Sequence, residues 1–380
     1  MKAIVCGMGR GVAEPAVPGA TLPRLALAAL AAFALTACGS GQPANAAGGK
    51  AGAAATAGSA ASSPGDSAVG VRAIAQQGAR GPGVTLPPNE LGVIPVLEYH
   101  ELVPVVKGQF ERPPARFRQD LEELYKRGYR PVNMSDVIDR KIQQLPRGIS
   151  PVVFTFDDAS PSQFSFVGSP GHIDPNSAIG IWLDFQKTHP DWADKGTFCM
   201  LPAATVGHAF FGDKGIDGQQ TAWRLVKLKW LADHGFELCD HTIWHARLDK
   251  YPDAMVQEQI ARGGLAIDSA VPGYKIRTFA LPLGMWPKNK PLAWEGAWTN
   301  PRNRQAYRYH FDSILEVAGT PNANPFAPGF DPHHIHRQIM SGNALENTLN
   351  HLEKTGPGGR YISDGNPGTV AKPPAVTAAR

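Results

Sequence analysis

From residue 93 onward, short apolar runs alternate with segments of helical periodicity, and this alternation restricts the fold more than any other feature of the chain. Helices placed between nearly all-apolar strands imply right-handed crossovers and a parallel sheet, either open and doubly wound or closed into a barrel. Seven runs are predicted to be strands, and this number over such a length favours an α/β fold with a distorted or incomplete parallel (β/α) barrel. The predicted strands are residues 93–100 (VIPVLEYH), 129–133 (YRPVN), 151–158 (PVVFTFDD), 197–201 (TFCML), 236–241 (FELCDH), 278–284 (TFALPLG) and 311–317 (FDSILEV).

Two of the intervening segments show helical spacing clearly. Phe117, Leu121 and Leu124 fall at i, i+4 and i+7, which predicts a helix with one face on the core. A second apolar face is predicted from three leucines spaced every three residues, at positions 225, 228 and 231. Two long interruptions, residues 159–175 and 202–220, are rich in Gly, Pro and polar residues, and loops of this size in a compact domain are either functional rims or mobile excursions.

Residues 1–38 have the features of an export signal. An apolar, Ala-rich stretch at residues 25–38 follows Arg24 and ends in small residues, and it is too short to predict a membrane-spanning helix. Residues 35–38 (LTAC) resemble a bacterial lipobox, in which Cys38 becomes the lipidated first residue of the mature protein. A weak membrane anchor or a plain cleaved signal is the alternative, and every reading predicts export, here to a bacterial cell envelope.

Composition divides the rest of the chain. Residues 39–88 are dominated by Ala, Gly, Ser and Pro, which predicts a disordered tether between the membrane and the domain. We expect one large domain over residues 89–370 and a flexible tail over residues 371–380. A net charge of +4, without a basic run interleaved with aromatic residues, argues against nucleic acid as a partner.

Two cysteines belong to the predicted domain. Cys199 and Cys239 lie in separate strand-like runs, without the CxxC spacing of a zinc knuckle. An exported compartment permits a disulfide between them, but two separate buried thiols are an equal alternative.

Polar groups that close two of the predicted strands suggest a metal-dependent hydrolase. Asp157 and Asp158 end one strand, and His241 and His245 follow another at a spacing that would place both imidazoles on one side of a helix. One carboxylate and two imidazoles bind a divalent ion and leave positions open for water and substrate, as a hydrolytic metal centre needs. The alternative for the two histidines is an exposed polar turn with one ring stacked on Trp244. The second carboxylate then remains available to accept a proton from water. The same ligand set also occurs in non-haem iron oxygenases, but the α/β alternation disfavours that alternative.

These residues resemble the polysaccharide deacetylases with a NodB homology domain, carbohydrate esterase family four, over most of residues 93–317. The first motif of the family, Thr-Phe-Asp-Asp, is seen at residues 155–158, and the second, His-Ser/Thr-x-x-His, at residues 241–245. A Tyr-His pair ends the first strand at residues 99–100, and Gly-Thr-Phe-Cys at residues 196–199 is similar to the Ala-Thr-Phe-Phe of the family.

The resemblance implies a reaction and a set of roles. Asp157 would be the general base, and Asp158, His241 and His245 would hold Zn²⁺ or a similar divalent ion. The implied reaction is hydrolysis of an acetyl group from the N-acetylated sugars of an acetylated polysaccharide, such as peptidoglycan, chitin-like chains or poly-N-acetylglucosamine. The third motif lies at residues 280–284, where the backbone N–H of Leu283 would stabilise the oxyanion.

Two further residues are predicted to bind the substrate. Pro282 belongs to the third motif, and Trp286 follows it with a ring that could stack on a sugar, although it could equally pack a loop.

The chain also departs from the pattern of the family. Ala280 stands where the family has the arginine that orients the base, so either Arg277 reaches the site, another cation substitutes, or Asp157 is held less firmly. Ala159 replaces the usual Gly after the Asp pair. The Leu-x-His motif that supplies the general acid is missing.

For the general acid, the stretch FDPHHIHRQI offers three histidines, of which His336 is our candidate, and His100 is a further one. Two alternative functions follow from the departures and the chemistry: a catalytically impaired glycan-binding envelope lipoprotein, and an O-acetyl esterase acting on xylan-like chains.

Overall fold

A computed structural model describes residues 86–203, 209–317, 319, 321–353 and 358–373, all within the compact unit Gly70–Arg380. The predicted export signal with Cys38, nearly all of the predicted tether and most of the predicted tail lie outside the described residues. Within the described part of the chain, no helix is both long and apolar enough to cross a membrane.

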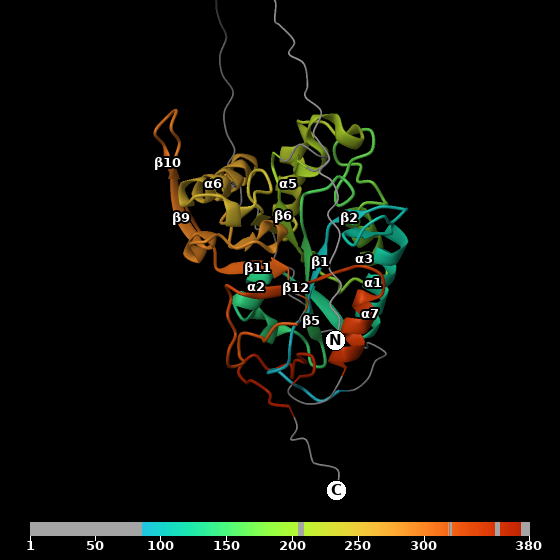
Figure 1. Cartoon of the computed structure of the whole chain (residues 1–380). Coiled ribbons are helices and arrows are strands. Elements are labelled where there is room, and N and C mark those ends of the chain that lie inside the picture. The colour runs from blue at the N-terminus through green and yellow to red at the C-terminus, as the bar shows by residue number, and fades with distance from the viewer. Residues whose placement is uncertain (1–85, 204–208, 318, 320, 354–357, 374–380) are drawn as a thin grey trace, which may run out of the picture. The chain divides into compact units, whose positions relative to one another are not determined.

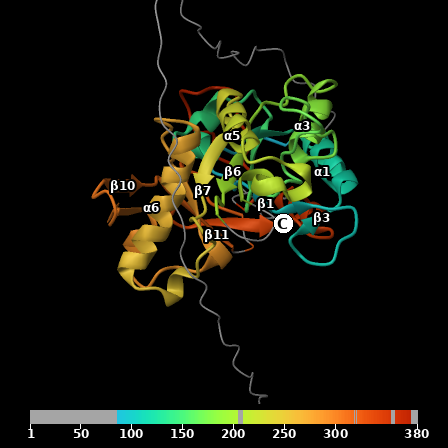
Figure 2. The same cartoon turned by 90° about the horizontal axis from the view of Figure 1, so that it is seen from above.

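Seven parallel strands form a closed ring (Figures 1 and 2). Its order is β1-β12-β11-β8-β7-β6-β5, and β5 pairs with β1 to close it. These strands are β1 (Val96–Tyr99), β5 (Ser150–Phe156), β6 (Thr197–Met200), β7 (Glu237–Asp240), β8 (Thr278–Ala280), β11 (Ser313–Val317) and β12 (Ile335–Ile339). The prediction of a parallel barrel of about seven strands is therefore confirmed, and the barrel is complete rather than open.

The membership of the ring differs from the prediction in one strand. The predicted strand at residues 129–133 exists as β4 (Tyr129–Val132), but it pairs with the first half of β5 outside the ring. The seventh member is β12, whose sequence IHRQI has no apolar run. Arg337 of this strand is 1% exposed because it points into the barrel, where a polar side chain breaks the apolar pattern expected of a buried strand.

Helices cover the outside of the ring. They are α1 (Pro114–Lys126), α2 (Met134–Ile138), α3 (Ala178–Gln186), α4 (Ala209–Gly212), α5 (Trp223–Asp233), α6 (Asp253–Ala270) and α7 (Ala344–Leu352). The face predicted at Phe117, Leu121 and Leu124 is confirmed, since all three are fully buried on α1. On α5 the prediction is wrong at Leu225, which is exposed, because the buried face of the helix is set by residues 223, 227, 228 and 231.

The remaining elements are short. A two-residue parallel pair, β2 (Glu101–Leu102) and β3 (Glu111–Arg112), follows β1, and an antiparallel hairpin, β9 (Glu295–Thr299) and β10 (Ala306–His310), follows β8. Single 3₁₀ turns occupy Lys141–Gln144, Asp213–Gly218, Leu248–Lys250, Pro282–Gly284 and Lys290–Ala293.

The inside of the barrel is packed with side chains, because alternate residues of each strand point inward. One apolar cluster contains Val96, Val153, Cys199, Cys239, Ala280, Leu315 and Ile335 from the seven strands. Cys199 and Cys239 are directly opposite each other on β6 and β7 and form a disulfide, which decides between the two alternatives left open by the sequence. The opposite faces of the strands, including Phe154, Phe156 and Phe198, pack against the helices.

Candidate metal centre and catalytic cavity

Polar side chains follow β5 and β7 at the carboxyl end of the barrel. Asp157 and Asp158 come after β5, and His241 and His245 come after β7. Asp158 (φ 73°) and His245 (φ 55°) have left-handed backbone conformations. Such conformations cost on the order of 1–3 kcal/mol in a residue other than glycine and cluster at functional sites. The two turns are therefore held by their surroundings in conformations that direct these side chains.

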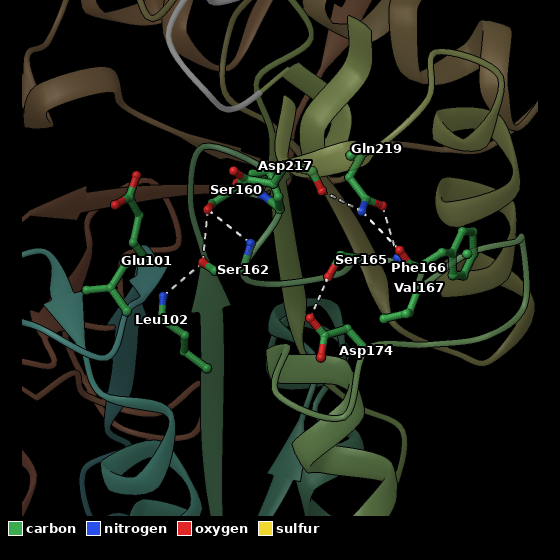
Figure 3. Close-up of a pocket in the computed structure, with 14 residues that line it drawn as sticks. Glu101, Leu102, Ser160, Ser162, Ser165, Phe166, Val167, Asp174, Asp217 and Gln219 are labelled. Carbon is green, nitrogen blue, oxygen red and sulfur yellow. Dashed lines mark hydrogen bonds between the residues drawn. The ribbon is translucent and has the colours of Figure 1, made fainter. Parts of the chain in front are cut away.

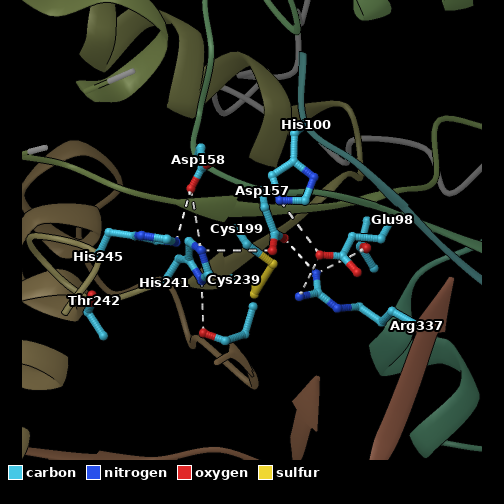
Figure 4. A network of polar contacts seen from close by, with 12 residues as sticks. Glu98, His100, Asp157, Asp158, Cys199, Cys239, His241, Thr242, His245 and Arg337 are labelled. Atoms are coloured by element: carbon cyan, nitrogen blue, oxygen red, sulfur yellow. Dashed lines mark hydrogen bonds and ion pairs between the residues drawn. A yellow bond between two sulfur atoms is a disulfide. The ribbon is translucent and has the colours of Figure 1, made fainter. Parts of the chain in front are cut away.

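Three of these side chains converge on one point (Figure 4). Asp158 Oδ1 lies 3.4 Å from His241 Nε2 and 3.6 Å from His245 Nε2. Ligands held about 2.0–2.2 Å from one tetrahedral zinc ion are about 3.3–3.6 Å apart. Asp158 Oδ1 and His241 Nε2 are both buried without a hydrogen-bond partner among the described residues. The donor set, the separations and the unpartnered atoms fit a divalent ion held by Asp158, His241 and His245.

The orientation of His241 is fixed by its second ring nitrogen. Nδ1 lies 2.9 Å from the carbonyl oxygen of Ala280, which can only accept, so Nδ1 carries the proton and Nε2 faces Asp158. Burial opposes the charged form of His241, but Asp157 and Asp158 outweigh it and raise the pKa of His241. A bound cation would take the place of the proton that these carboxylates attract.

The second histidine has the opposite shift. Burial and the neighbouring His241 lower the pKa of His245 to about 4. Its imidazole is therefore neutral at pH 7, which is the form that binds a metal.

The segment that carries the two histidines is a turn, not the helix expected from their i, i+4 spacing. Residues 241–247 have no helical assignment, and Thr242 at φ 64° joins His245 in the left-handed region. The rings still approach, with centroids 4.9 Å apart. The turn therefore brings the imidazoles together by a different route from the predicted helix.

Asp157 is held by an arginine that the sequence did not identify. Arg337 Nη1 donates to Asp157 Oδ1 over 2.6 Å, and both side chains are buried. Burial opposes ionisation of Asp157, but Arg337 and His241 outweigh it and lower the pKa of Asp157. Of the alternatives raised by Ala280, the structure shows a substitute cation, while Arg277 is bonded to Asp139 and Asp312 instead.

Glu98 is a second buried group that sequence analysis missed. It lies on β1, 1% exposed, with Oε1 3.3 Å from Arg337 Nη2 and 3.6 Å from His100 Nε2. Burial raises the pKa of Glu98 to about 7, although Arg337 opposes the shift. No motif marks Glu98 or Arg337 in the sequence, because their partners lie on other strands.

A cavity of about 690 Å³ opens over these groups. Its lining combines the polar cluster with an apolar rim: Glu98, His100, Asp157, Asp158, His241, His245, Phe110, Leu281, Leu283, Met285, Val317 and Ile339. Leu283, the predicted oxyanion donor, has φ 56° and is half exposed on this lining. Pro282 does not line the cavity; it is buried at the start of the 3₁₀ turn that carries Leu283.

The structure does not bring His336 or Trp286 into this cavity. His336 precedes Arg337 on β12 and so points to the opposite face of the strand, with Nε2 3.4 Å from Glu316 Oε2. Trp286 Nε1 donates to Glu316, and the ring lies 4.9 Å from that of His334. These contacts place Trp286 in loop packing. Among the predicted general acids, only His100 lies on the cavity wall.

A second cavity of about 600 Å³ is drawn in Figure 3. Its walls come mainly from the two long interruptions in the sequence, and Glu101 lines both cavities. Gln219 ties the two loops together, since it accepts from Phe166 N over 2.9 Å and donates to Phe166 O over 3.0 Å. Described residues of both segments therefore form a rim that adjoins the cavity over the candidate metal site through Glu101, while residues 204–208 lie outside the described part of the chain.

Part of the chain matches a family of known proteins in sequence. Residues 195–295 match the family model of polysaccharide deacetylases. The matched part includes β6, β7, both histidines of the metal centre and the turn with Leu283, but not Asp157 and Asp158. No curated protein matches the chain in sequence.

Three solved structures show likeness to the chain at low identity. Deacetylase PplD from Streptococcus pyogenes, in complex with acetate, is 17% identical with a TM-score of 0.48, covering 70% of this chain and 100% of that one. IcaB from Ammonifex degensii is 18% identical (TM-score 0.46; 69% and 95% covered). The putative polysaccharide deacetylase BA0330 from Bacillus anthracis is 14% identical (TM-score 0.47; 67% and 68% covered). At these TM-scores the likeness supports neither an activity nor a substrate for this chain.

Proposed function

We propose that the protein is a metal-dependent hydrolase that removes acetyl groups from the N-acetylated sugars of an envelope or extracellular polysaccharide. The observation that carries the proposal is the convergence of Asp158, His241 and His245 beside a second, separately held carboxylate, Asp157. A metal site alone would not require that second carboxylate. The match of residues 195–295 to polysaccharide deacetylases supports the substrate class.

The residues of the cavity would have different roles in this reaction. Asp158, His241 and His245 would hold Zn²⁺ or another divalent ion, which lowers the pKa of a coordinated water and polarises a carbonyl. Asp157 accepts the proton of the attacking water, since Arg337 occupies only its Oδ1. The backbone N–H of Leu283 is the candidate donor to the developing oxyanion.

The leaving amine requires a proton donor. His100 is the candidate for this role, because it lines the cavity beside Glu98, whereas His336 does not.

The N-terminal region supports a location for this reaction. An export signal followed by lipidation at Cys38 would attach the protein to a membrane of the bacterial cell envelope, with the Ala- and Gly-rich segment as a tether. Acetylated glycans of the envelope would then be within reach of the domain.

Two other functions remain as outcomes of the test. An O-acetyl esterase would use the same residues, because attack on an ester and on an amide carbonyl needs the same base and oxyanion donor. A catalytically impaired glycan-binding lipoprotein was suggested by Ala280, but Arg337 supplies a cation to Asp157 and weakens that alternative.

The test is acetate release from a panel of N-acetylated chito-oligosaccharides, poly-N-acetylglucosamine, peptidoglycan and acetylated xylan, with metal analysis on the same protein. We expect release from an N-acetylated substrate and a loss of about 10²–10⁴-fold in Asp157→Asn, which removes the base but keeps the shape. Folded, metal-loaded wild-type protein that releases no acetate from any of these substrates would contradict the proposal. Release from xylan alone would favour the esterase.

A further inference from the structure

Arg337 is a buried charged side chain inside the barrel. Its guanidinium contacts four groups: Nη1 donates to Asp157 Oδ1 over 2.6 Å and to Thr155 Oγ1 over 3.4 Å, Nη2 lies 3.3 Å from Glu98 Oε1, and Nε donates to Glu316 O over 3.1 Å. Nε and Nη1 therefore donate hydrogen bonds, and Nη2 adds only an ion pair with Glu98; the two donors fix the plane of the guanidinium.

We propose that Arg337, braced by Glu98, is the positioning residue of the catalytic base, in the place that Ala280 leaves without a cation. This inference rests on the proposed function, in which Asp157 is the base. Glu98, Arg337 and Asp157 come from β1, β12 and the end of β5, and β1 lies between the other two strands in the ring. The brace is therefore built across three consecutive strands (Figure 4).

The contacts of Asp157 determine which of its two carboxylate oxygens can accept a proton from the attacking water. Arg337 holds Oδ1, whereas Oδ2 lies 3.8 Å from His241 Nε2, on the side of the metal centre. A carboxylate that could rotate freely would present either oxygen to the attacking water. The hydrogen bond from Arg337 to Oδ1 prevents this rotation and keeps Oδ2 directed at the point where Asp158 and the two histidines converge.

A purely structural role explains the arrangement less well. Replacing a buried ion pair by apolar residues of similar volume is often neutral or stabilising, so the fold alone does not require a buried guanidinium here. The rest of the barrel interior includes an apolar cluster of this kind.

A second metal ion is also disfavoured at this point. Glu98, His100 and Asp157 could offer three ligand atoms within 4.8 Å of one another. Arg337 already donates to Asp157 and forms an ion pair with Glu98, so a divalent cation would face the guanidinium.

The test compares Arg337→Ala with Arg130→Ala in the full chain. Arg130 is the matched control, because it is also a buried arginine bonded to an aspartate, Asp191, but it lies on β4 outside the ring. We expect Arg337→Ala to lower kcat at least 100-fold, with KM and metal affinity within about threefold of wild type. Millimolar methylguanidine should restore at least tenfold of the lost kcat. Arg130→Ala should keep the wild-type kcat and show no response to methylguanidine.

Two further measurements keep the inference testable. If Arg337→Ala does not fold, Arg337→Lys replaces it, and we expect at least a tenfold loss of kcat because an ammonium cannot hold both carboxylates in the same geometry. A crystal structure of the Arg337 variant gives a readout without activity: the carboxylate of Asp157 should be displaced while Asp158, His241 and His245 keep their separations.

The outcomes separate the two proposals. Wild-type kcat in a folded Arg337 variant, or an unmoved Asp157 in its crystal structure, overturns the positioning role even if the enzyme is active. Inactivity of the wild type on every substrate, with Asp157 displaced in the variant, contradicts the proposed function and leaves the positioning of this carboxylate intact.

Discussion

The Cys199–Cys239 disulfide should contribute substantially to the stability of the barrel. The two cysteines are 40 residues apart in the chain and join neighbouring strands β6 and β7. For a closed loop of this length, the loss of chain entropy in the unfolded state corresponds to about 4 kcal/mol. We therefore expect Cys199→Ala/Cys239→Ala to lose about this much free energy of unfolding, or roughly 10 °C in Tm for a domain of this size.

The measurement is equilibrium urea unfolding followed by tryptophan fluorescence, with and without a reductant. Wild-type protein that is unfolded and reduced, then refolded with the thiols kept reduced, should show the same loss as the double variant. The double variant is its own control, because a reductant should not change its stability. His241 lies two residues after Cys239, so we also expect weaker metal binding in the reduced wild type and in the double variant.

One result would refute this reasoning. If the double variant unfolds within about 1 kcal/mol of the wild type, and the wild type is insensitive to reduction, then the two sulfurs are not cross-linked in solution. The alternative of two separate buried thiols, which the sequence left open, would then apply.

Three further predictions concern other parts of the site and fold. Asp158→Ala should abolish stoichiometric zinc binding and reduce acetate release at least 100-fold while the protein stays folded; metal analysis with circular dichroism checks this, and full zinc occupancy would contradict the ligand assignment. Gly263→Ala should destabilise the protein by about 1–3 kcal/mol in urea unfolding, because the added Cβ would lie 2.2 Å from Asp240 Oδ1; unchanged stability would show that α6 can shift freely. Arg277 lowers the pKa of Asp139, so Arg277→Gln should reduce the free energy of unfolding by its full amount above about pH 4, and this reduction should become smaller as the pH falls below 3.8. A reduction that does not change between pH 5 and pH 2 would disprove this link.

The sequence indicated which residues would meet at the candidate metal centre, because those residues are local. Asp157 and Asp158 are adjacent, and His241 and His245 are four residues apart, so two short segments that both follow strands contain every predicted metal ligand and the base. In a parallel barrel, the carboxyl ends of all strands lie at one rim. The proximity of the two segments therefore followed from the fold class alone.

The conformation of the histidine segment could not be predicted in the same way. An i, i+4 pair is most simply read as a helix, but Thr242 has a left-handed backbone, which is disfavoured for a β-branched residue. Asp240 Oδ1 accepts from Thr242 N over 2.8 Å, and the carbonyl of Ala280 orients His241. These contacts depend on neighbouring elements, so local propensity gives no sign of the turn.

The contact between Arg337 and Asp157 could not be predicted from the sequence for a different reason. A buried strand was expected to show an apolar run, and IHRQI shows none, because Arg337 points into the barrel toward two carboxylates. Its contact with Asp157 joins residues 180 apart in the chain. That distance is bridged only when β12 pairs with β1 and β1 pairs with β5, which is the step that closes the ring.

Ring closure also allows a cation to reach Asp157 from strands other than β8. Ala280 on β8 reaches β5 around the ring through β7 and β6, whereas Arg337 on β12 reaches it in the other direction through β1. Inward positions of every strand in a small barrel face a common interior, so a side chain as long as arginine can approach the same carboxylate from either side. On the positioning role proposed above, the requirement would be for a guanidinium at Asp157 rather than for an arginine in a particular motif. In this chain the β8 position instead contributes the carbonyl of Ala280, which sets the tautomer of His241.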